Sequence, residues 1–322
     1  MILLLLACAE EPVVQDSGPA PEPLPLPDLT GIDLPAAYAE ILRTALSVDM
    51  RVAWRGHAES LTEREPSCPN LWTGLPDADM GDDEDLAWSD RCSTNAGVSF
   101  GGALQWNNSL SATQDASGTT TTGSRSLQGD GVVSHGDEVL FEFDGEGSDS
   151  FTLIRDGDYE RWVYNSLVQA TVTGSLPFPD GPAGGWRTDL NLELSGGDGA
   201  RVAARGNVFF FEHRIQDRFD SGAMDLEMPG PGSVAPEDCA LEPHGTLSLR
   251  DSDAIWYDLV FLPRYEDGDY SDDPYAVCDG CATLYVRGQE QPELVCPDLS
   301  WLFVEAPTPP DPADYALSVR DP

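Results

Sequence analysis

The chain has 322 residues, of which 57 are acidic and 17 basic, and its formal net charge is −40. Binding to nucleic acid depends on Lys and Arg side chains that neutralise phosphates, and docking on anionic lipid depends on a polybasic patch. The charge argues against both, so we expect no nucleic-acid partner. The length suffices for one large all-β domain or two smaller ones.

The N-terminus is apolar from Ile2 to Leu6, and Ala7 precedes Cys8. The segment Leu5-Leu6-Ala7-Cys8 resembles the lipobox of bacterial lipoproteins. The resemblance implies that residues 1–7 are a signal peptide, which is removed and takes no part in the fold. It also implies that Cys8 carries a lipid anchor, which would attach the chain to a membrane. Ala9, rather than Asp, follows the cysteine, and in such lipoproteins this implies the outer membrane.

Residues 8–30 are rich in Pro and acidic side chains and offer almost nothing to pack. Such a segment cannot offset the entropy lost on ordering, so we predict a linker that acts as a spacer behind the anchor. A β domain is predicted over residues 31–305, and it begins with one short helix. Pro35 suits a first helical turn, and Tyr38, Ile41 and Leu42 follow at helical spacing.

Six cysteines remain when Cys8 is set aside, and an even number in an exported chain indicates disulfide bonds. Cys68 and Cys92 have no other cysteine near them in the sequence, so we expect them to bond to each other. Two acidic loops are candidate calcium sites, because calcium takes clustered carboxylate ligands. The candidate ligands are Asp77, Asp79, Asp82, Asp83, Asp85, Asp267 and Asp269. The alternative is that both loops are simply solvated, and no other cofactor is expected.

After Met50 the apolar residues are interpreted as recurring at every second position. Runs around residues 139–143, 190–194, 224–228, 246–250 and 282–287 alternate apolar with polar side chains, which is typical of antiparallel strands with one solvated face. Turn clusters such as Asp144-Gly145 and Asp156-Gly157-Asp158 separate the runs. The sequence predicts an all-β fold, either a large antiparallel sandwich or a curved barrel-like sheet of about a dozen strands, with one short N-terminal helix.

Two short motifs suggest catalysis. Residues 97–101 match the G-x-S-x-G nucleophile elbow, but a strand pattern follows Ser99 where the elbow needs a helix. The segment Glu142-Phe143-Asp144-Gly145-Glu146 resembles the E-x-D-x-E strand of a glycosidase family with a β-jelly-roll fold. The resemblance implies that Glu142 is the nucleophile and Glu146 the acid/base. Against this, Gly145-Glu146-Gly147 is predicted as a turn, which would leave a polar outer face ending in a hairpin loop.

The C-terminal part holds four cysteines. Residues 229–236 are either a sub-boundary before a Cys-rich module at 237–305 or a long hairpin loop, and residues 306–322 are predicted to be a Pro-rich tail. The cysteines are Cys239, Cys278, Cys281 and Cys296, which allow three connectivities. A zinc site and a redox pair remain alternatives. Asp-Gly between Cys278 and Cys281 indicates a turn, so these two could bond to each other, but we favour Cys281–Cys296 with Cys239–Cys278.

The body of the chain, with its Cys278-Asp279-Gly280-Cys281 segment, a later cysteine and acidic strands, resembles uncharacterised cell-envelope lipoproteins of GC-rich bacteria. This implies an outer-membrane lipoprotein that faces the periplasm or the cell surface. We expect a non-enzymatic binding or structural role, with a protein or glycan partner that the sequence does not identify. The alternative function is a surface carbohydrate hydrolase that uses Glu142 and Glu146.

Overall fold

The computed structural model describes residues 25–73, 86–89, 91–115, 118–177, 185–197, 201–211, 213–229, 243–261, 280–299, 301–304 and 309–316. The chain divides into two compact units, residues 1–30 and 31–322. In the described part of the first unit, the Asp28 carboxylate accepts a hydrogen bond from the backbone N–H of Thr30 at 2.9 Å. The second unit holds the helices and strands.

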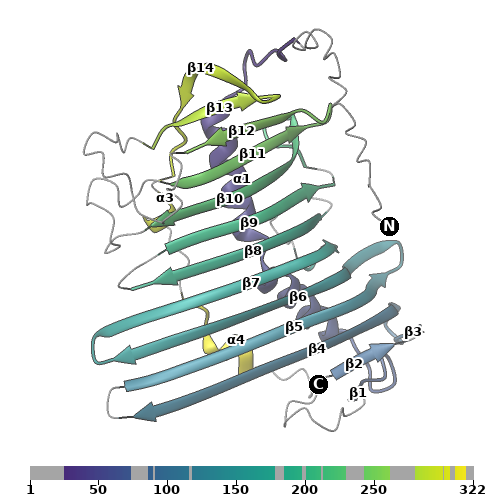
Figure 1. The fold of residues 1–322 in the computed structure, drawn as a ribbon. Coiled ribbons are helices and arrows are strands. Elements are labelled where there is room, and N and C mark those ends of the chain that lie inside the picture. The colour runs from purple at the N-terminus through teal and green to yellow at the C-terminus, as the bar shows by residue number, and fades with distance from the viewer. Residues whose placement is uncertain are drawn as a thin grey trace, which may run out of the picture. The chain divides into compact units, whose positions relative to one another are not determined.

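One antiparallel sheet of 14 strands dominates the described residues of the second unit (Figure 1). The strands are β1 (Trp72–Thr73), β2 (Leu86–Ser89), β3 (Cys92–Ser93), β4 (Val98–Asp115), β5 (Gly118–His135), β6 (Glu138–Asp156), β7 (Tyr159–Thr173), β8 (Trp186–Gly196), β9 (Arg201–Phe210), β10 (Phe219–Pro229), β11 (His244–Asp251), β12 (Trp256–Val260), β13 (Ala282–Val286) and β14 (Gln289–Val295). From β4 onward each strand pairs with the next, and β3 pairs with β4 outside the main order. The predicted all-β class is confirmed, in its form of one curved sheet.

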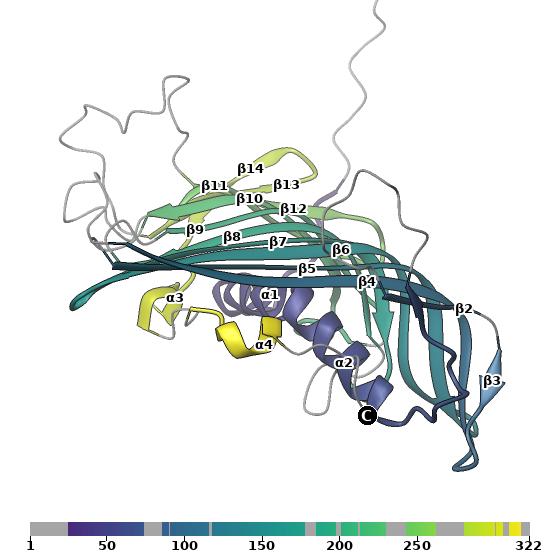
Figure 2. The same ribbon diagram turned by 90° about the horizontal axis from the view of Figure 1, so that it is seen from below.

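The sheet has two chemically different faces because side chains alternate along every strand. In β7 the residues Trp162, Tyr164 and Ser166 are buried, whereas Asn165 and Leu167 are exposed. We call the buried side the inner face and the exposed side the outer face. Four described helices lie on the inner side of the sheet (Figure 2). They are α1 (Leu34–Ser47), α2 (Met50–Thr62), α3 (Trp301–Val304) and α4 (Pro312–Ala316).

The prediction of a single N-terminal helix is wrong, because α2 follows α1 directly. Asp49 caps α2 by accepting a hydrogen bond from the backbone N–H of Arg51 at 2.9 Å. Ala53, Trp54, His57 and Leu61 are buried, at helical spacing. The expected period of two residues after Met50 therefore does not hold until the strands begin.

The predicted turn at Gly145-Glu146-Gly147 is also wrong, because β6 continues through it to Asp156. Gly145 has φ +139, and a Cβ atom there would lie 2.2 Å from the Gln169 carbonyl oxygen of β7. Glycine at this position therefore allows a close approach of two strands, which a sequence pattern does not distinguish from a turn.

The described residues on both sides of 229–236, and part of 306–322, belong to the sheet domain. β10 and β11 pair with each other, with Met224 opposite Leu247, so residues 229–236 do not separate two sheets. The segment 306–322 contains α4, and Tyr315 of this helix is buried. The C-terminal part thus packs against the domain rather than forming a tail throughout. Among the described helices, none is both long and apolar enough to cross a membrane.

Disulfide bonds join Cys68 to Cys92 and Cys281 to Cys296, as the sequence predicts. Next to the Cys281–Cys296 bond, Ala282 of β13 pairs with Val295 of β14. This pairing places the two cysteines opposite each other at the ends of the two strands. The turn of this hairpin lies at Arg287-Gly288, both with positive φ. Cys239 and Cys278 lie outside the described residues, so a bond between them stays a prediction.

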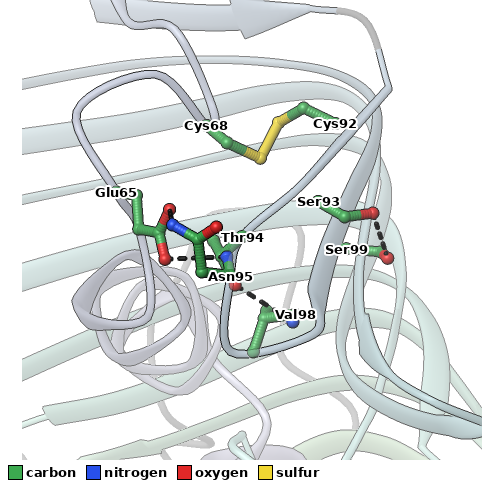
Figure 3. Close-up of a disulfide and its surroundings, with 8 residues drawn as sticks. All are labelled: Glu65, Cys68, Cys92, Ser93, Thr94, Asn95, Val98 and Ser99. Atoms are coloured by element: carbon green, nitrogen blue, oxygen red, sulfur yellow. Dashed lines mark hydrogen bonds between the residues drawn. A yellow bond between two sulfur atoms is a disulfide. The ribbon is translucent and has the colours of Figure 1, made fainter.

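The Cys68–Cys92 bond ties the segment after α2 to β3, with 5.6 Å between the two Cα atoms (Figure 3). Hydrogen bonds support the same connection. The Glu65 carboxylate accepts from the Asn95 backbone N–H at 2.8 Å and from the Asn95 side-chain amide at 2.7 Å. The Cys68–Cys92 disulfide therefore closes a loop of the chain beside the hydrogen-bonded turn at Asn95.

We expect the double variant Cys68→Ala/Cys92→Ala to lower the free energy of unfolding by about 3 kcal/mol, because the disulfide restricts the unfolded chain. Equilibrium denaturation measures this change. The control Asn95→Ala removes the exposed side-chain hydrogen bond to Glu65, keeps the backbone one, and should cost about 1 kcal/mol or less. Equal losses in the two variants would contradict a specific contribution of the disulfide.

Candidate functional site

The acidic segment lies on the outer face of β6. Glu142, Asp144 and Glu146 are two residues apart and point to the same side, with Glu142 half-buried and the other two exposed. Glu142 Oε2 accepts a hydrogen bond from Thr173 Oγ1 at 2.7 Å.

Glu142 and Glu146 follow one another along a single strand. At about 3.3 Å per residue, the Cα atoms of Glu142 and Glu146 are about 13 Å apart along one strand. Glycosidase carboxyl groups flank the scissile bond at about 5–9.5 Å. Those values are separations between carboxyl groups rather than Cα atoms, so the backbone spacing alone does not identify Glu142 and Glu146 as a catalytic pair.

Ser99 of the G-x-S-x-G motif lies within β4, opposite Ser134 of β5. Its hydroxyl oxygen is 2.8 Å from that of Ser93 (Figure 3). A nucleophile elbow requires a strained turn between a strand and a helix. Ser99 therefore belongs to a regular ladder of strands.

The other predicted site residues are not covered by the structure. The lipidation candidate Cys8 and all seven calcium candidates lie outside the described residues. Within the part of the chain that is described, no group of three or more His, Cys, Asp or Glu side chains is arranged to hold a metal ion.

The most organised group of polar side chains lies on the inner face, where sequence reasoning predicted nothing. It consists of Arg125 of β5, Asp149 of β6, Tyr164 of β7 and Tyr315 of α4, and we call it the Arg125 cluster. Arg125 Nε donates to Asp149 Oδ1 at 3.0 Å, and Arg125 Nη2 donates to Asp149 Oδ2. Asp149 Oδ2 also accepts from the hydroxyls of Tyr164 at 3.2 Å and Tyr315 at 3.1 Å.

The ion pair of the Arg125 cluster is almost completely removed from water, with side-chain exposures of 3% for Arg125 and 0% for Asp149. Burial raises the pKa of Asp149, and the hydrogen bonds and charge of Arg125 act against this rise. Burial also opposes the charge of Arg125, but its pKa is raised because Asp149 stabilises the charged form. Each ion therefore depends on the other.

Aromatic rings complete the surroundings of Arg125. Its guanidinium carbon lies 4.1 Å from the centre of the Tyr315 ring and 5.4 Å from that of Trp54 in α2. Such cation–π contacts are stronger away from water. The cluster thus joins two helices to three neighbouring strands.

A second ion pair lies at the start of α2. Arg51 Nε donates to Asp49 Oδ2 at 2.6 Å, and the Arg51 guanidinium carbon lies 4.8 Å from the centre of the Tyr164 ring. The backbone N–H of Met50 donates to Ser166 Oγ of β7 at 3.0 Å. These contacts fix the first turn of α2 against the inner face, close to the Arg125 cluster.

The chemistry available to the Arg125 cluster is limited by its contacts. Both carboxylate oxygens of Asp149 are occupied, and the Tyr164 and Tyr315 hydroxyls donate to the same carboxylate. The geometry is that of an internal fastening between helices and sheet. A signal for it exists in the sequence, since Asp149 lies between Gly147 and Phe151 at an inward position of β6.

His57 of α2 is a second buried group that sequence reasoning did not identify. Its ring centre lies 4.6 Å from that of Trp106, 5.9 Å from that of Trp54 and 6.0 Å from that of Phe141. Neither ring nitrogen has a hydrogen-bond partner among the described residues. Burial lowers the pKa of His57 to about 3, so the ring is neutral near pH 7.

Comparison of the chain with protein-family models, with curated proteins and with solved structures gives no match.

We expect Arg125→Met to lower the free energy of unfolding by about 3–5 kcal/mol, because it leaves Asp149 buried without its partner charge. The double variant Arg125→Met/Asp149→Leu should lose less, since no unpaired charge remains. Denaturant unfolding of the three proteins measures both changes.

The exposed ion pair of Arg205 and Asp225 is the matched control, with side-chain exposures of 61% and 80%. Arg205→Met should change the stability by less than about 1 kcal/mol. An Arg125→Met variant as stable as Arg205→Met would contradict the assigned role of the buried pair.

We expect His57 to make the free energy of unfolding depend on pH. Its folded pKa of about 3 lies below the value of about 6.5 in an unfolded chain, so the unfolded state takes up the proton first as the pH falls. The stability that comes from neutral His57 is complete above pH 6.5 and is lost from there towards pH 3. Relative to His57→Phe, wild type should lose about 1.4 kcal/mol per pH unit within this window.

Unfolding measured from pH 7.5 to pH 4.5 tests this expectation. Trp106→Phe is the control, because it changes packing beside His57 without removing a titrating group. Its stability relative to wild type should not change with pH. Parallel curves for wild type and His57→Phe would rule out His57 as the source.

Proposed function

We propose that the protein is a non-enzymatic lipoprotein of the cell envelope, anchored through Cys8, with a binding role carried by its outer sheet face. The observation that carries the binding role is the asymmetry of the sheet. The described helices cover the inner side, whereas none of them lies on the outer side of long strands such as β6, with 19 residues (Figure 2). A broad exposed face on a rigid sheet is suited to contact with a partner.

The contacts of the described titratable groups support a non-enzymatic role. The side chains with shifted pKa values are engaged in internal contacts, as in the Arg125 cluster. Asp251 is a further example, because it accepts hydrogen bonds from the Tyr257 hydroxyl at 2.7 Å and from the backbone N–H groups of Asp253 and Ile255 at 3.0 Å. These bonds organise the hairpin between β11 and β12. The hydrolase alternative has no comparable support, since the backbone spacing of Glu142 and Glu146 does not by itself identify a catalytic pair.

The placement in the envelope has support from the sequence and from the disulfides. The lipobox-like Leu5-Leu6-Ala7-Cys8 precedes a Pro-rich acidic segment, which is the order of anchor and spacer. Disulfide bonds persist in oxidising compartments and are rare in the cytosol. The bonds Cys68–Cys92 and Cys281–Cys296 are therefore consistent with export.

We expect wild-type protein expressed from its native gene to sediment with membranes and to be labelled by an alkyne analogue of palmitate. Cys8→Ser should be unlabelled and should leave the membrane fraction, because it lacks the acceptor thiol. Ser17→Ala, in the predicted spacer, is the control and should behave as wild type. Wild type that carries no label would disprove the anchor.

A further inference from the structure

A neutral area interrupts the acidic surface on the outer face of β4–β7. It is formed by the outward-facing alternate residues of 107–113, 120–126, 148–154 and 161–167, and we call it the neutral patch. The register aligns four outward residues of each strand into rows, as in Asn107 opposite Ser126. Arg161 is the one charged residue among these positions, and Ser and Thr make up most of the others.

The neutrality of the patch is notable in a chain with a net charge of −40. Acidic side chains begin directly beyond its edge on the same face. Glu146 and Asp144 follow along β6, and Asp130 lies opposite Asp144 on β5. The patch is thus a part of the outer face where an uncharged partner meets neither repulsion nor a competing ionic attraction.

The patch offers both polar and apolar contacts. The hydroxyl oxygens of Ser109 and Ser124 are 2.8 Å apart, and those of Ser111 and Thr122 are 2.9 Å apart. A hydroxyl has one donor and two acceptor positions, so these pairs keep hydrogen-bonding capacity towards solvent.

Apolar side chains lie beside these hydroxyl rows. Ile154 and Leu167 are 37% and 40% exposed within the patch, and Tyr159, at its edge on β7, is 41% exposed. The outer face here therefore presents hydroxyl rows together with apolar surface and an aromatic ring.

We propose that the neutral patch binds an uncharged polysaccharide. A sugar ring presents hydroxyl groups at its edge and C–H groups on its face, which match the hydroxyl rows and the side chains of Ile154, Leu167 and Tyr159. A polyanion would be repelled by the net charge, and a polycation would be drawn to the carboxylates outside the patch. The inference rests on the proposed binding function and names the class of its ligand.

A second copy of the chain fits the patch less well. Its four strands and seven residues of length span about 14 Å by 20 Å, or about 300 Å² in plan. A stable protein–protein interface buries about 800 Å² on each partner. A larger contact between two copies would bring the flanking carboxylates of both together.

Native electrophoresis of the full-length protein in gels that contain a polysaccharide tests the proposal. The neutral polymers are dextran, glucomannan and arabinoxylan, and alginate is the anionic comparison. We expect at least one neutral polymer to retard wild type, without release of reducing ends, and alginate to have no such effect. Ser150→Asp places a charge at the centre of the patch and should weaken the apparent affinity at least tenfold.

Thr246→Asp is the matched control, since it adds the same charge to the outer face in β11, away from the patch. It should bind as wild type, and circular dichroism should show both variants folded. The inference is overturned if no neutral polymer retards wild type, if Thr246→Asp loses as much affinity as Ser150→Asp, or if wild type is a dimer that Ser150→Asp dissociates.

Failure of this inference and failure of the proposed function have different signatures. Loss of retardation with intact palmitate labelling would overturn the polysaccharide ligand and leave the anchored protein in place. Retardation accompanied by cleavage of the polymer would overturn the non-enzymatic function while supporting the ligand class.

Discussion

In this sheet one face is buried against α1 and α2, and the covering of that face shapes the rest of the second unit. The inner face carries large apolar side chains such as Trp186, Phe141 and Phe143, which are fully buried. Removing such surface from water is the main favourable contribution to folding. The described helices supply this cover on the inner face, and none of them lies on the outer face.

The Arg125 cluster shows how this cover is positioned. Apolar packing alone is not directional, so it does not specify where a short helix lies on a wide sheet. The cluster adds direction, because Tyr315 of α4 must reach Asp149 while Trp54 of α2 lies near Arg125. A buried ion pair adds little net stability compared with an apolar replacement, but its unpaired halves are costly. We interpret the pair as the contact that sets the position of α4.

Charged side chains are distributed differently on the two faces of the sheet. The inner face tolerates an ion pair only where both partners meet, whereas the outer face carries carboxylates freely. Against this background the neutral patch is a local departure from the composition. The Ser and Thr hydroxyls of the neutral patch hydrogen-bond readily with water, which favours solubility. Their regular rows also suit contact with an uncharged partner.

Local chemistry decided what could be predicted from the sequence. Alternation over five or more residues identifies β8, β10 and β13, because the two faces of a strand are set by neighbouring positions. The Cys281–Cys296 bond could be predicted because a short hairpin joins the two cysteines. The helix α2 was missed because it carries Arg, His and Glu among its apolar positions, and the buried stripe emerges only at helical spacing. Gly145 was misread because glycine serves both turns and close strand approach.

The site on the inner face was decided by tertiary structure. Arg125 and Asp149 are 24 residues apart, and Asp149 and Tyr315 are 166 apart. Whether such residues meet depends on the register of β5 and β6 and on the path of the chain to α4. The neutral patch has the same origin, since its rows exist only when four strands align. The sequence by itself determined the alternation of each strand and the total charge, but only the pairing of distant strands brought particular side chains together. This is because hydrogen-bonded register acts between segments that are far apart in the sequence.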